Sequence, residues 1–180
     1  SSDDEAVFEN RFKVEDGSRI YWLPQELILF SKSAVSRNTK IEVDNSSEFL
    51  AFDHVILGRK AMGEVLSVSN FIDRWKIYYD NRLVYFDQFG WKKEVPRGIS
   101  GFKNISSFAS FFYVGRKAEY YLEKLRAYTT SSIKVFAGSS LRNNCLITRL
   151  HSRDISAVRE ETKKLLGSIW NLEEPEVWRV

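Results

Sequence analysis

Cysteine and histidine are nearly absent from this sequence of 180 residues. Cys145 is the single cysteine, which excludes an internal disulfide framework, and His54 and His151 are the only histidines. A zinc site of the Cys/His type needs several such ligands, so this class of metal site is excluded as well. A lone thiol is typical of a reducing compartment, and we expect a cytoplasmic protein.

Long hydrophobic runs and a strong charge surplus are missing too. No uninterrupted apolar stretch reaches the roughly 18 to 20 residues that a membrane-spanning helix requires, and no charged and then apolar leader opens the sequence, so we expect no membrane association. Lysine and arginine number 27 against 24 aspartates and glutamates, a net charge of +3 that is spread along the sequence. A surplus this small predicts no binding of nucleic acid.

Motifs of the common enzyme classes do not occur. The sequence contains no G-x-S-x-G or H-E-x-x-H motif and neither of the glycine-rich phosphate-binding loops. We therefore expect no catalytic residues and no enzyme. A small carboxylate-based hydrolase stays open as an alternative, because it needs only two acids roughly 5 to 10 Å apart across an accessible cleft.

What the sequence does contain is apolar and aromatic side chains, at 43% and 14% of its residues, enough for one compact domain spanning residues 1–180. Apolar residues alternate from Ala6 to about Phe89, which predicts short antiparallel strands and a strand-rich region over residues 5–95. Later spacing predicts helices at about 116–128 and 153–171, the second with Ser152 as its N-cap. The predicted fold is mainly β, with antiparallel or mixed strands and two helices in the C-terminal half.

Residues Arg74 to Trp91 form the clearest predicted hairpin. Asp80 and Asn81 suit a two-residue turn between two aromatic-rich strands. Aromatic side chains that pair across these strands stabilise a sheet, which is the simplest interpretation. The alternative is a ligand- or carbohydrate-binding β domain that uses the same rings as a platform.

The run WLPQELILF, Trp22 to Phe30, places Glu26 on a strand whose two faces are both mostly apolar. An unpaired buried carboxylate costs several kcal/mol, so we expect an arginine, backbone donors or a cation to compensate Glu26. Pro24 cannot donate to a strand ladder, so the strand must bulge, lie at an edge or break there.

The stretch Ala51 to Glu64 is the second unusual segment. Gly58 and Gly63 bracket Arg59 and indicate a bulge or a close backbone approach, while Asp53 and Glu64 flank them. If this strand lies beside the first, Arg59 could pair with Glu26 or Asp53 in an internal ion-pair network. The same acids could instead line a passage for a divalent cation, since their oxygens are suitable ligands.

Together, WLPQE at residues 22–26 and GRKAMGE at residues 58–64 resemble two motifs of the urease accessory protein UreD family, called UreH in some species. Asp53 after Phe52 matches an acid that precedes the second motif in the family. The closing segments, with Arg149, Leu150, Pro175 and Trp178, are similar to the family's last strand, helix and tail, except that Glu176 stands where the tail usually carries arginine. The resemblance covers about Ala6 to Val180 and lacks the family's glycine-rich N-terminal third, so we expect an incomplete family fold.

The resemblance implies an elongated, helix-like stack of strands and a non-catalytic role in urease maturation. Its partners would be apo-urease, UreF and, through UreF, the GTPase UreG. No cofactor would be tightly bound, and nickel would be cargo in transit. The resemblance marks Glu26, Asp53 and Glu64 as carboxylates on the nickel route, supported by Gln25, Gly58, Arg59 and Gly63.

Overall fold

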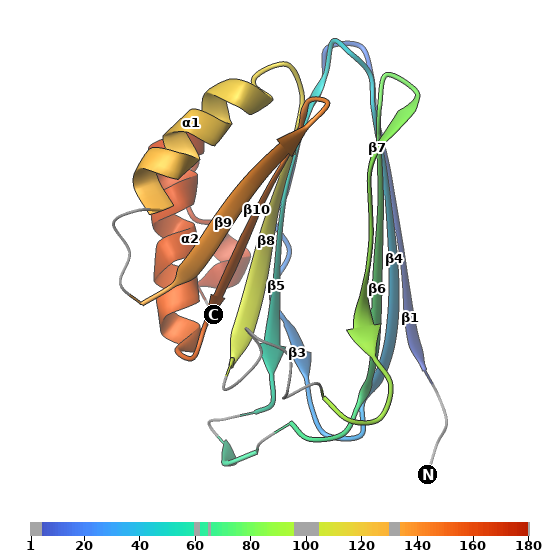
Figure 1. The fold of residues 1–180 in the computed structure, drawn as a ribbon, viewed down its shortest axis with the longest axis vertical. Coiled ribbons are helices and arrows are strands. Elements are labelled where there is room, and N and C mark those ends of the chain that lie inside the picture. Colours follow the sequence, from blue (N-terminus) through green and yellow to red (C-terminus); the bar gives the residue numbers. More distant parts are fainter. Residues whose placement is uncertain (1–4, 60–61, 65, 96–104, 130–133, 180) are drawn as a thin grey trace.

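Two β-sheets pack face to face in the computed structural model, which describes residues 5–59, 62–64, 66–95, 105–129 and 134–179 (Figure 1). The first sheet has the strand order β1-β4-β6-β7, and the second has the order β2-β5-β8-β10-β9, with β3 also paired to β5. Both α-helices lie on the outer face of the second sheet, whereas no described helix covers the first (Figure 1). The elements are β1 (Ala6–Val14), β2 (Arg19–Trp22), β3 (Leu27–Leu29), β4 (Ala34–Val43), β5 (Glu48–Leu57), β6 (Asn70–Tyr79), β7 (Arg82–Trp91), β8 (Ser107–Val114), α1 (Ala118–Thr129), β9 (Phe136–Arg142), β10 (Cys145–Ser152), α2 (Ile155–Trp170) and the 3-10 turn η2 (Glu176–Trp178).

The N-terminal strands wind between the two sheets. The chain passes from β1 to β2 and β3, returns to β4, crosses to β5 and returns again to β6. Each pass through a sheet runs in the same direction, so β1, β4 and β6 pair in parallel, as do β2 and β3 with β5. The expectation of antiparallel strands is therefore wrong for this half, because period-two alternation reports burial and not strand direction. The mainly β class with mixed strands and two late helices is confirmed.

Alternating side chains on the second sheet face two different environments. On β5, Ala51 and Val55 point between the sheets, whereas Leu50 and Phe52 point toward the helices. One apolar cluster fills the space under α1 and α2, and two further clusters lie between the sheets. Among the described residues, the apolar side chains between the sheets thus form two clusters in place of one continuous core, and the gap between these clusters holds charged residues.

Local sequence signals set several boundaries. Asp80 and Asn81 both have positive φ and form the predicted two-residue turn between β6 and β7. Both helices lie where the spacing predicts them, but the N-cap of α2 is Asp154, whose carboxylate accepts from the backbone of Ser156 and Ala157. The assignment of Ser152 as N-cap is wrong, since its hydroxyl accepts from the backbone amide of Asp154, the residue that precedes the first residue of α2. Among the described residues, no helix is long and apolar enough to cross a membrane.

Candidate functional site

A layer of charged side chains separates the two inter-sheet apolar clusters. On β5, β6 and β7, the inward residues two positions before and two positions after the charged residue lie in or against different clusters. On β4 and β10, the charged residue lies directly beside one cluster. On β6, for example, Phe71 and Trp75 belong to different clusters and Asp73 lies between them. We call the following five residues the polar layer: Arg37 on β4, Asp53 on β5, Asp73 on β6, Asp87 on β7 and Arg149 on β10.

Strand register brings these residues together from distant parts of the sequence. Arg37 is the direct cross-strand neighbour of Asp73 in the first sheet. In the second sheet, Asp53 and Arg149 both pair with Ser110 of β8 from opposite sides and so form one row across three strands. The layer therefore runs across the molecule from β4 and β5 to β7 and β10.

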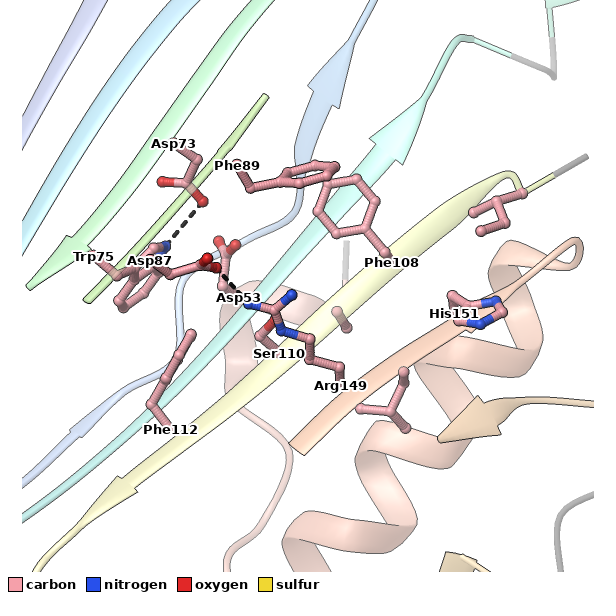
Figure 2. A pocket seen from close by; sticks show the side chains of 13 residues that line it. Asp53, Asp73, Trp75, Asp87, Phe89, Phe108, Ser110, Phe112, Arg149 and His151 are labelled. Carbon is pink, nitrogen blue, oxygen red and sulfur yellow. Dashed lines mark hydrogen bonds and ion pairs between the residues drawn. The ribbon is translucent and has the colours of Figure 1, made fainter. Parts of the chain in front are cut away.

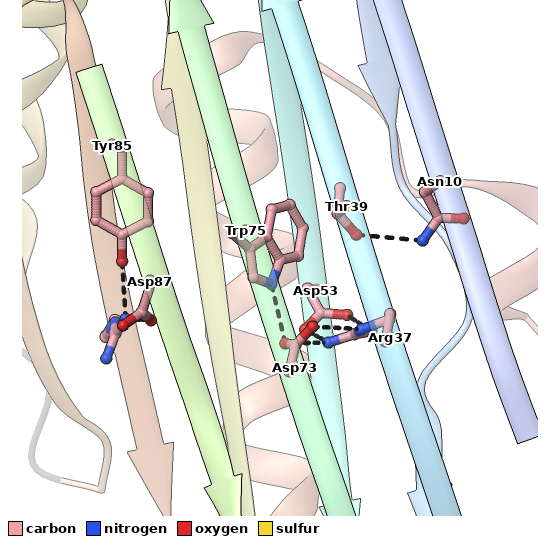
Figure 3. A network of polar contacts seen from close by, with 9 residues as sticks. Asn10, Arg37, Thr39, Asp53, Asp73, Trp75, Tyr85 and Asp87 are labelled. Atoms are coloured by element: carbon pink, nitrogen blue, oxygen red, sulfur yellow. Dashed lines mark hydrogen bonds and ion pairs between the residues drawn. The ribbon is translucent and has the colours of Figure 1, made fainter. Parts of the chain in front are cut away.

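The β4 end of the layer is a tightly bonded triad (Figure 3). Arg37 donates from Nη1 and Nη2 to the two oxygens of Asp53, each at 2.6 Å. It also donates from Nε and Nη2 to Asp73 at 2.9 and 2.6 Å, and the indole of Trp75 donates to Asp73 at 2.9 Å. The three charged side chains are only 7 to 8% exposed, so Arg37 joins the two sheets through two buried, bidentate ion pairs.

The triad carries more negative than positive charge in a poorly hydrated space. One guanidinium faces two carboxylates, which leaves a formal charge of −1. Burial raises the pKa of Asp53, and the nearby Arg37 only partly opposes that shift. Burial also disfavours the charge of Arg37, but the two carboxylates outweigh burial and raise its pKa. The triad therefore favours an additional positive charge, either a proton or a cation.

The β7 end of the layer is more open. Arg149 binds Asp87 and also donates from the same nitrogen, Nη2, to the Tyr85 hydroxyl at 2.9 Å. The side chain of Arg149 is 52% exposed and that of Asp87 is 29% exposed. Burial raises the pKa of Tyr85 to about 12, so this phenol stays protonated at physiological pH.

A cavity of about 290 Å³ connects the two ends of the layer (Figure 2). Asp53 and Asp73 line it near the triad, while Asp87 and Arg149 line it near the more exposed end. Its other walls are mostly aromatic or apolar: Trp75, Phe89, Ile105, Phe108, Ala109, Ser110, Phe112, Leu150 and His151. Three carboxylates outnumber the one guanidinium, Arg149, in the lining of a mostly apolar cavity, an arrangement that favours a cation over an anion.

Known sequences that are similar to this chain share one family name. The sequence model for the UreD urease accessory protein family matches residues 1–179. The chain belongs to the UreD family. It is 33% identical over 181 residues to the urease accessory protein UreD of Rhizobium leguminosarum bv. trifolii (strain WSM2304), covering 97% of this chain and 64% of that protein. It is 32% identical over 182 residues to the UreD of Agrobacterium fabrum (strain C58 / ATCC 33970), covering 97% of this chain and 62% of that protein.

This chain therefore spans less than two thirds of the length of these UreD relatives. Among its described residues, no three His, Cys, Asp or Glu side chains are grouped as a resident metal site would require. The polar layer thus differs from a closed metal centre, because arginines occupy the positions beside its carboxylates.

The first UreD motif, WLPQE, anchors the C-terminal tail to the sheet. The chain breaks from strand geometry at Pro24, between β2 and β3 on the edge of the second sheet, as predicted. The Pro24 carbonyl accepts from the indole of Trp178 at 2.8 Å, and the Gln25 amide donates to the Val177 carbonyl at 2.6 Å. Gln25 therefore contacts the C-terminal tail, and its position in the motif did not predict this contact.

Glu26 lies outside the polar layer, on the opposite face of the second sheet. It binds Arg159 of α2 through its Oε1 and lies 3.8 Å from Nδ1 of His54. Since Asp53 and His54 are consecutive on β5, they point to opposite faces, which separates Glu26 from Asp53 by the thickness of the sheet. The expected compensating arginine is present, but it is Arg159.

Glu64 and Arg59 form a separate pair in the loop after β5. Glu64 accepts from Arg59 Nε at 3.0 Å and from the backbone of Ser31 at 3.1 Å. The expectation that Arg59 pairs with Glu26 or Asp53 is wrong, because Arg59 belongs to this loop and Arg37 takes its place beside Asp53. Gly58 has φ +80°, and a Cβ there would lie 3.0 Å from the Glu64 carbonyl, which confirms the predicted close approach. Gly63 also has positive φ, +72°, with open space around it.

Sequence interpretation placed Asp53 correctly among the inward acids but missed Arg37, Asp73, Asp87 and Arg149. Each of these four residues lies on a strand whose inward neighbours, two positions away on either side, are mostly apolar or aromatic. The signal that identifies them is a charged residue at an otherwise apolar, inward position of a strand. The same signal pointed to Glu26, but the strand breaks there, so the alternation of inward and outward side chains does not apply.

His54 gives a testable pH dependence. It is 2% exposed, and burial lowers its pKa from 6.5 to about 4, so the folded protein keeps it neutral. Its contribution to stability is complete above pH 6.5 and is lost as the pH falls toward 4, because the unfolded chain takes up the proton first. The loss should approach 3 kcal/mol, roughly, at pH 4.

Urea unfolding of wild type and His54→Gln between pH 7 and pH 4 measures this effect. The His54→Gln variant should lose stability less steeply over this range, whereas His151→Gln, at a half-exposed site, should change the slope less. Equal slopes for wild type and His54→Gln would contradict the assignment.

Proposed function

We propose that this chain acts in urease maturation as a non-catalytic scaffold in the cytoplasm. It binds apo-urease and UreF, brings UreG into the complex through UreF, and helps deliver nickel to the urease active site. Membership of the UreD urease accessory protein family supports this role, as do relatives that carry the same name. Nickel is cargo in this scheme and not a resident cofactor.

The polar layer is the part of the chain best suited to meet nickel. A divalent ion of borderline hardness accepts carboxylate oxygens, and Asp53, Asp73 and Asp87 supply them around one cavity. The formal charge of the layer, three carboxylates against two guanidinium groups, is −1. This excess negative charge around a partly open, mostly apolar cavity is the observation that carries the proposal.

Among the acids named by the resemblance, Asp53 lies in this cavity. Glu26 and Glu64 lie outside it, each paired with its own arginine. Contact of Glu26 or Glu64 with nickel stays a prediction, and it would require stations on the route beyond the inter-sheet cavity. Their salt bridges give both residues a structural reason to be charged.

The alternative of an aromatic ligand platform has less support. Trp75 and Trp91 of the β6–β7 hairpin are buried between the sheets, at 3% and 7% exposure. Phe86 is exposed and Tyr78 is half-buried on the outer face of the hairpin, but Lys40 lies over the Tyr78 ring and leaves less of it for a sugar. A carboxylate hydrolase is also disfavoured, because Arg37 holds both Asp53 and Asp73 in charge-assisted hydrogen bonds.

Asp87→Asn tests the proposal with little risk to the fold, because Asp87 is partly exposed and its partner Arg149 can reach solvent. The variant keeps the side-chain shape but removes one anionic ligand. We expect nickel loading of urease to fall roughly tenfold, the scale seen when a group that supports a metal ligand is lost. Nickel per urease is measured by elemental analysis after activation in cells that depend on this chain.

Glu42→Gln, on the outer face of β4, is the matched control and should leave nickel loading unchanged. Both variants should still co-purify with UreF and apo-urease. Wild-type nickel loading with Asp87→Asn would remove the polar layer from the route, and failure of the wild-type chain to co-purify with either partner would reject the scaffold role.

A further inference from the structure

Strand β9 forms one edge of the second sheet, and among the described strands it pairs with β10 alone (Figure 1). Its sequence is FAGSSLR, and most of these residues are exposed. Phe136 at its start is 68% exposed, although its ring stacks on that of His151. The backbone on the free side of β9 is therefore accessible to another strand.

The other edges of the two sheets carry features that hinder the addition of a strand. On the first sheet, β7 has the inward-pointing charge of Asp87, and β1 has several charged side chains, namely Glu9, Arg11 and Lys13. On the second sheet, β2 and β3 are only four and three residues long and are separated by a break at Pro24. Strand β9 lacks these features, because its residues are small or apolar up to the final Arg142.

The geometry of the β9–β10 hairpin identifies the backbone groups that face the free edge. Asn143 and Asn144 both have positive φ and form a two-residue turn, so Arg142 and Cys145 are the hydrogen-bonded pair beside it. Every second residue of β9 bonds to β10 in the same way. The N–H and C=O groups of the residues between them point away from β10, and these residues are Ala137, Ser139 and Leu141.

The free edge of β9 is complementary to itself in the antiparallel orientation. When Ser139 lies opposite the partner's Ser139, Ala137 lies opposite the partner's Leu141, and each such pair exchanges two backbone hydrogen bonds. Gly138 then lies opposite the partner's Ser140, so small side chains meet on the other face. This register pairs β9 over its whole length and uses every backbone group that faces the free edge.

The charge on β9 also fits this register. Arg142 is the only charged residue of the strand, and antiparallel pairing places the two copies of Arg142 at opposite ends. Each guanidinium faces the exposed ring of the partner's Phe136, an arrangement that is favourable for a cation and an aromatic ring. A foreign peptide would gain less, because specificity in strand addition comes from side-chain pockets and the small residues in the middle of β9 offer little of this kind.

We propose that β9 is a self-pairing strand through which two copies of this chain associate about a two-fold axis. The second sheets of the two copies then join edge to edge into one continuous sheet. This association is separate from the proposed function and requires no nickel. A single strand pair covers less surface than the roughly 1,200 to 2,000 Å² of a stable interface, so the dissociation constant should be on the order of 100 μM.

Sedimentation velocity of the 180-residue chain from about 5 to about 500 μM measures this association. Ser139→Lys and Ser139→Glu each place like charges opposite one another at the two-fold axis, and each should raise the dissociation constant about fivefold. An equimolar mixture of these two variants brings opposite charges together and should associate at least as tightly as wild type. Ser139→Ala is the neutral control, because it also removes the hydrogen bond to Thr148 but adds no charge.

Two further variants separate β9 from the rest of the surface. Ala137→Pro removes an N–H that faces the free edge, so it should weaken association while the pairing of β9 with β10 is retained. Val7→Lys changes an exposed apolar residue on the edge strand β1 and should leave association unchanged. Circular dichroism and thermal unfolding show whether each variant is folded, and Ala137→Pro provides the test if the charged variants are not.

Several results would overturn self-pairing through β9. They are a wild-type chain that stays monomeric up to about 500 μM, unchanged association of folded Ser139→Lys or Ala137→Pro, and a mixture of the two charged variants that associates no better than either alone. An equal loss in Val7→Lys would move the contact to β1. A monomeric chain that binds a different protein through β9 would also reject the second copy as the occupant of this edge.

Discussion

Arg37→Leu is expected to lower the free energy of unfolding by about 3 to 5 kcal/mol, the usual cost of removing one partner from a buried ion pair. Arg37 makes four hydrogen bonds to Asp53 and Asp73, and all three side chains are almost fully buried. The variant would leave two carboxylates facing each other across the sheets, with the Trp75 indole as the remaining side-chain donor among the described residues. Urea unfolding followed by tryptophan fluorescence measures the change.

The matched control is Arg11→Leu, an exposed arginine on the neighbouring strand β1. This substitution should change stability by less than roughly 0.5 kcal/mol, as surface substitutions usually do. A loss of similar size in both variants would mean that the triad is not what joins the sheets.

The pH dependence of Arg37→Leu separates charge from packing. Burial already raises the pKa of Asp53 in the wild type, so its contribution to stability is most favourable below the pKa of an unfolded aspartate and is lost as the pH rises through the folded pKa. Without Arg37 this shift should grow, and the variant should recover stability as the pH falls from 7 toward 5. The triple variant Arg37→Leu/Asp53→Asn/Asp73→Asn should be more stable than Arg37→Leu at pH 7, because it carries no buried charge. A pH-independent loss in Arg37→Leu would assign the effect to packing alone.

Gly90→Ala is the second prediction with a large effect, about 3 kcal/mol or more of lost stability. Gly90 on β7 pairs with Ile72 on β6. A Cβ at Gly90 would lie 2.0 Å from the Phe71 carbonyl oxygen and 2.9 Å from the Ile72 Cα, and both contacts are with backbone that cannot rotate away. Only separation of the two strands relieves the clash, so the variant should disturb the hairpin that carries Asp87.

Gly138→Ala on β9 is the control for Gly90→Ala, because a Cβ at Gly138 meets nothing within 4 Å. It should be neutral or slightly stabilising, since alanine restricts the unfolded chain more than glycine does. Thermal unfolding of both variants gives the comparison. Equal melting temperatures for Gly90→Ala and wild type would show that β7 can shift away from β6 without cost.

Period-two alternation and turn residues predicted the strand content, the β6–β7 hairpin and the change to helices in the C-terminal half. They could not predict parallel pairing, since a strand alternates in the same way whichever direction its neighbour runs. The N-cap of α2 shows a similar limit, because Ser152 and Asp154 are both good capping residues and only the backbone decides between them.

The candidate site was only partly predictable for a physical reason. A poorly hydrated acid requires a partner, and this rule correctly demanded one for Glu26, whose side chain is 22% exposed. The rule does not identify the arginine that forms the ion pair, and Arg159 is separated from Glu26 by 133 positions in the sequence. Proximity in the sequence favoured Arg59, but a tight loop turns Arg59 back onto Glu64.

The winding of the chain between the sheets also determines which contacts can form early. Ala6 of β1 pairs with Val35 of β4, a separation of 35 − 6 = 29 residues, and Ala34 pairs with Asn70, a separation of 70 − 34 = 36. The two-residue turn between β6 and β7, by contrast, closes a hairpin of the kind that forms within about 10 μs in isolation. Nucleation should therefore begin at β6–β7, and the parallel passes should follow more slowly as their longer loops close. The half of the layer that holds Arg37 and Asp53 would then assemble last, after the strands that present Asp73 and Asp87 are already paired.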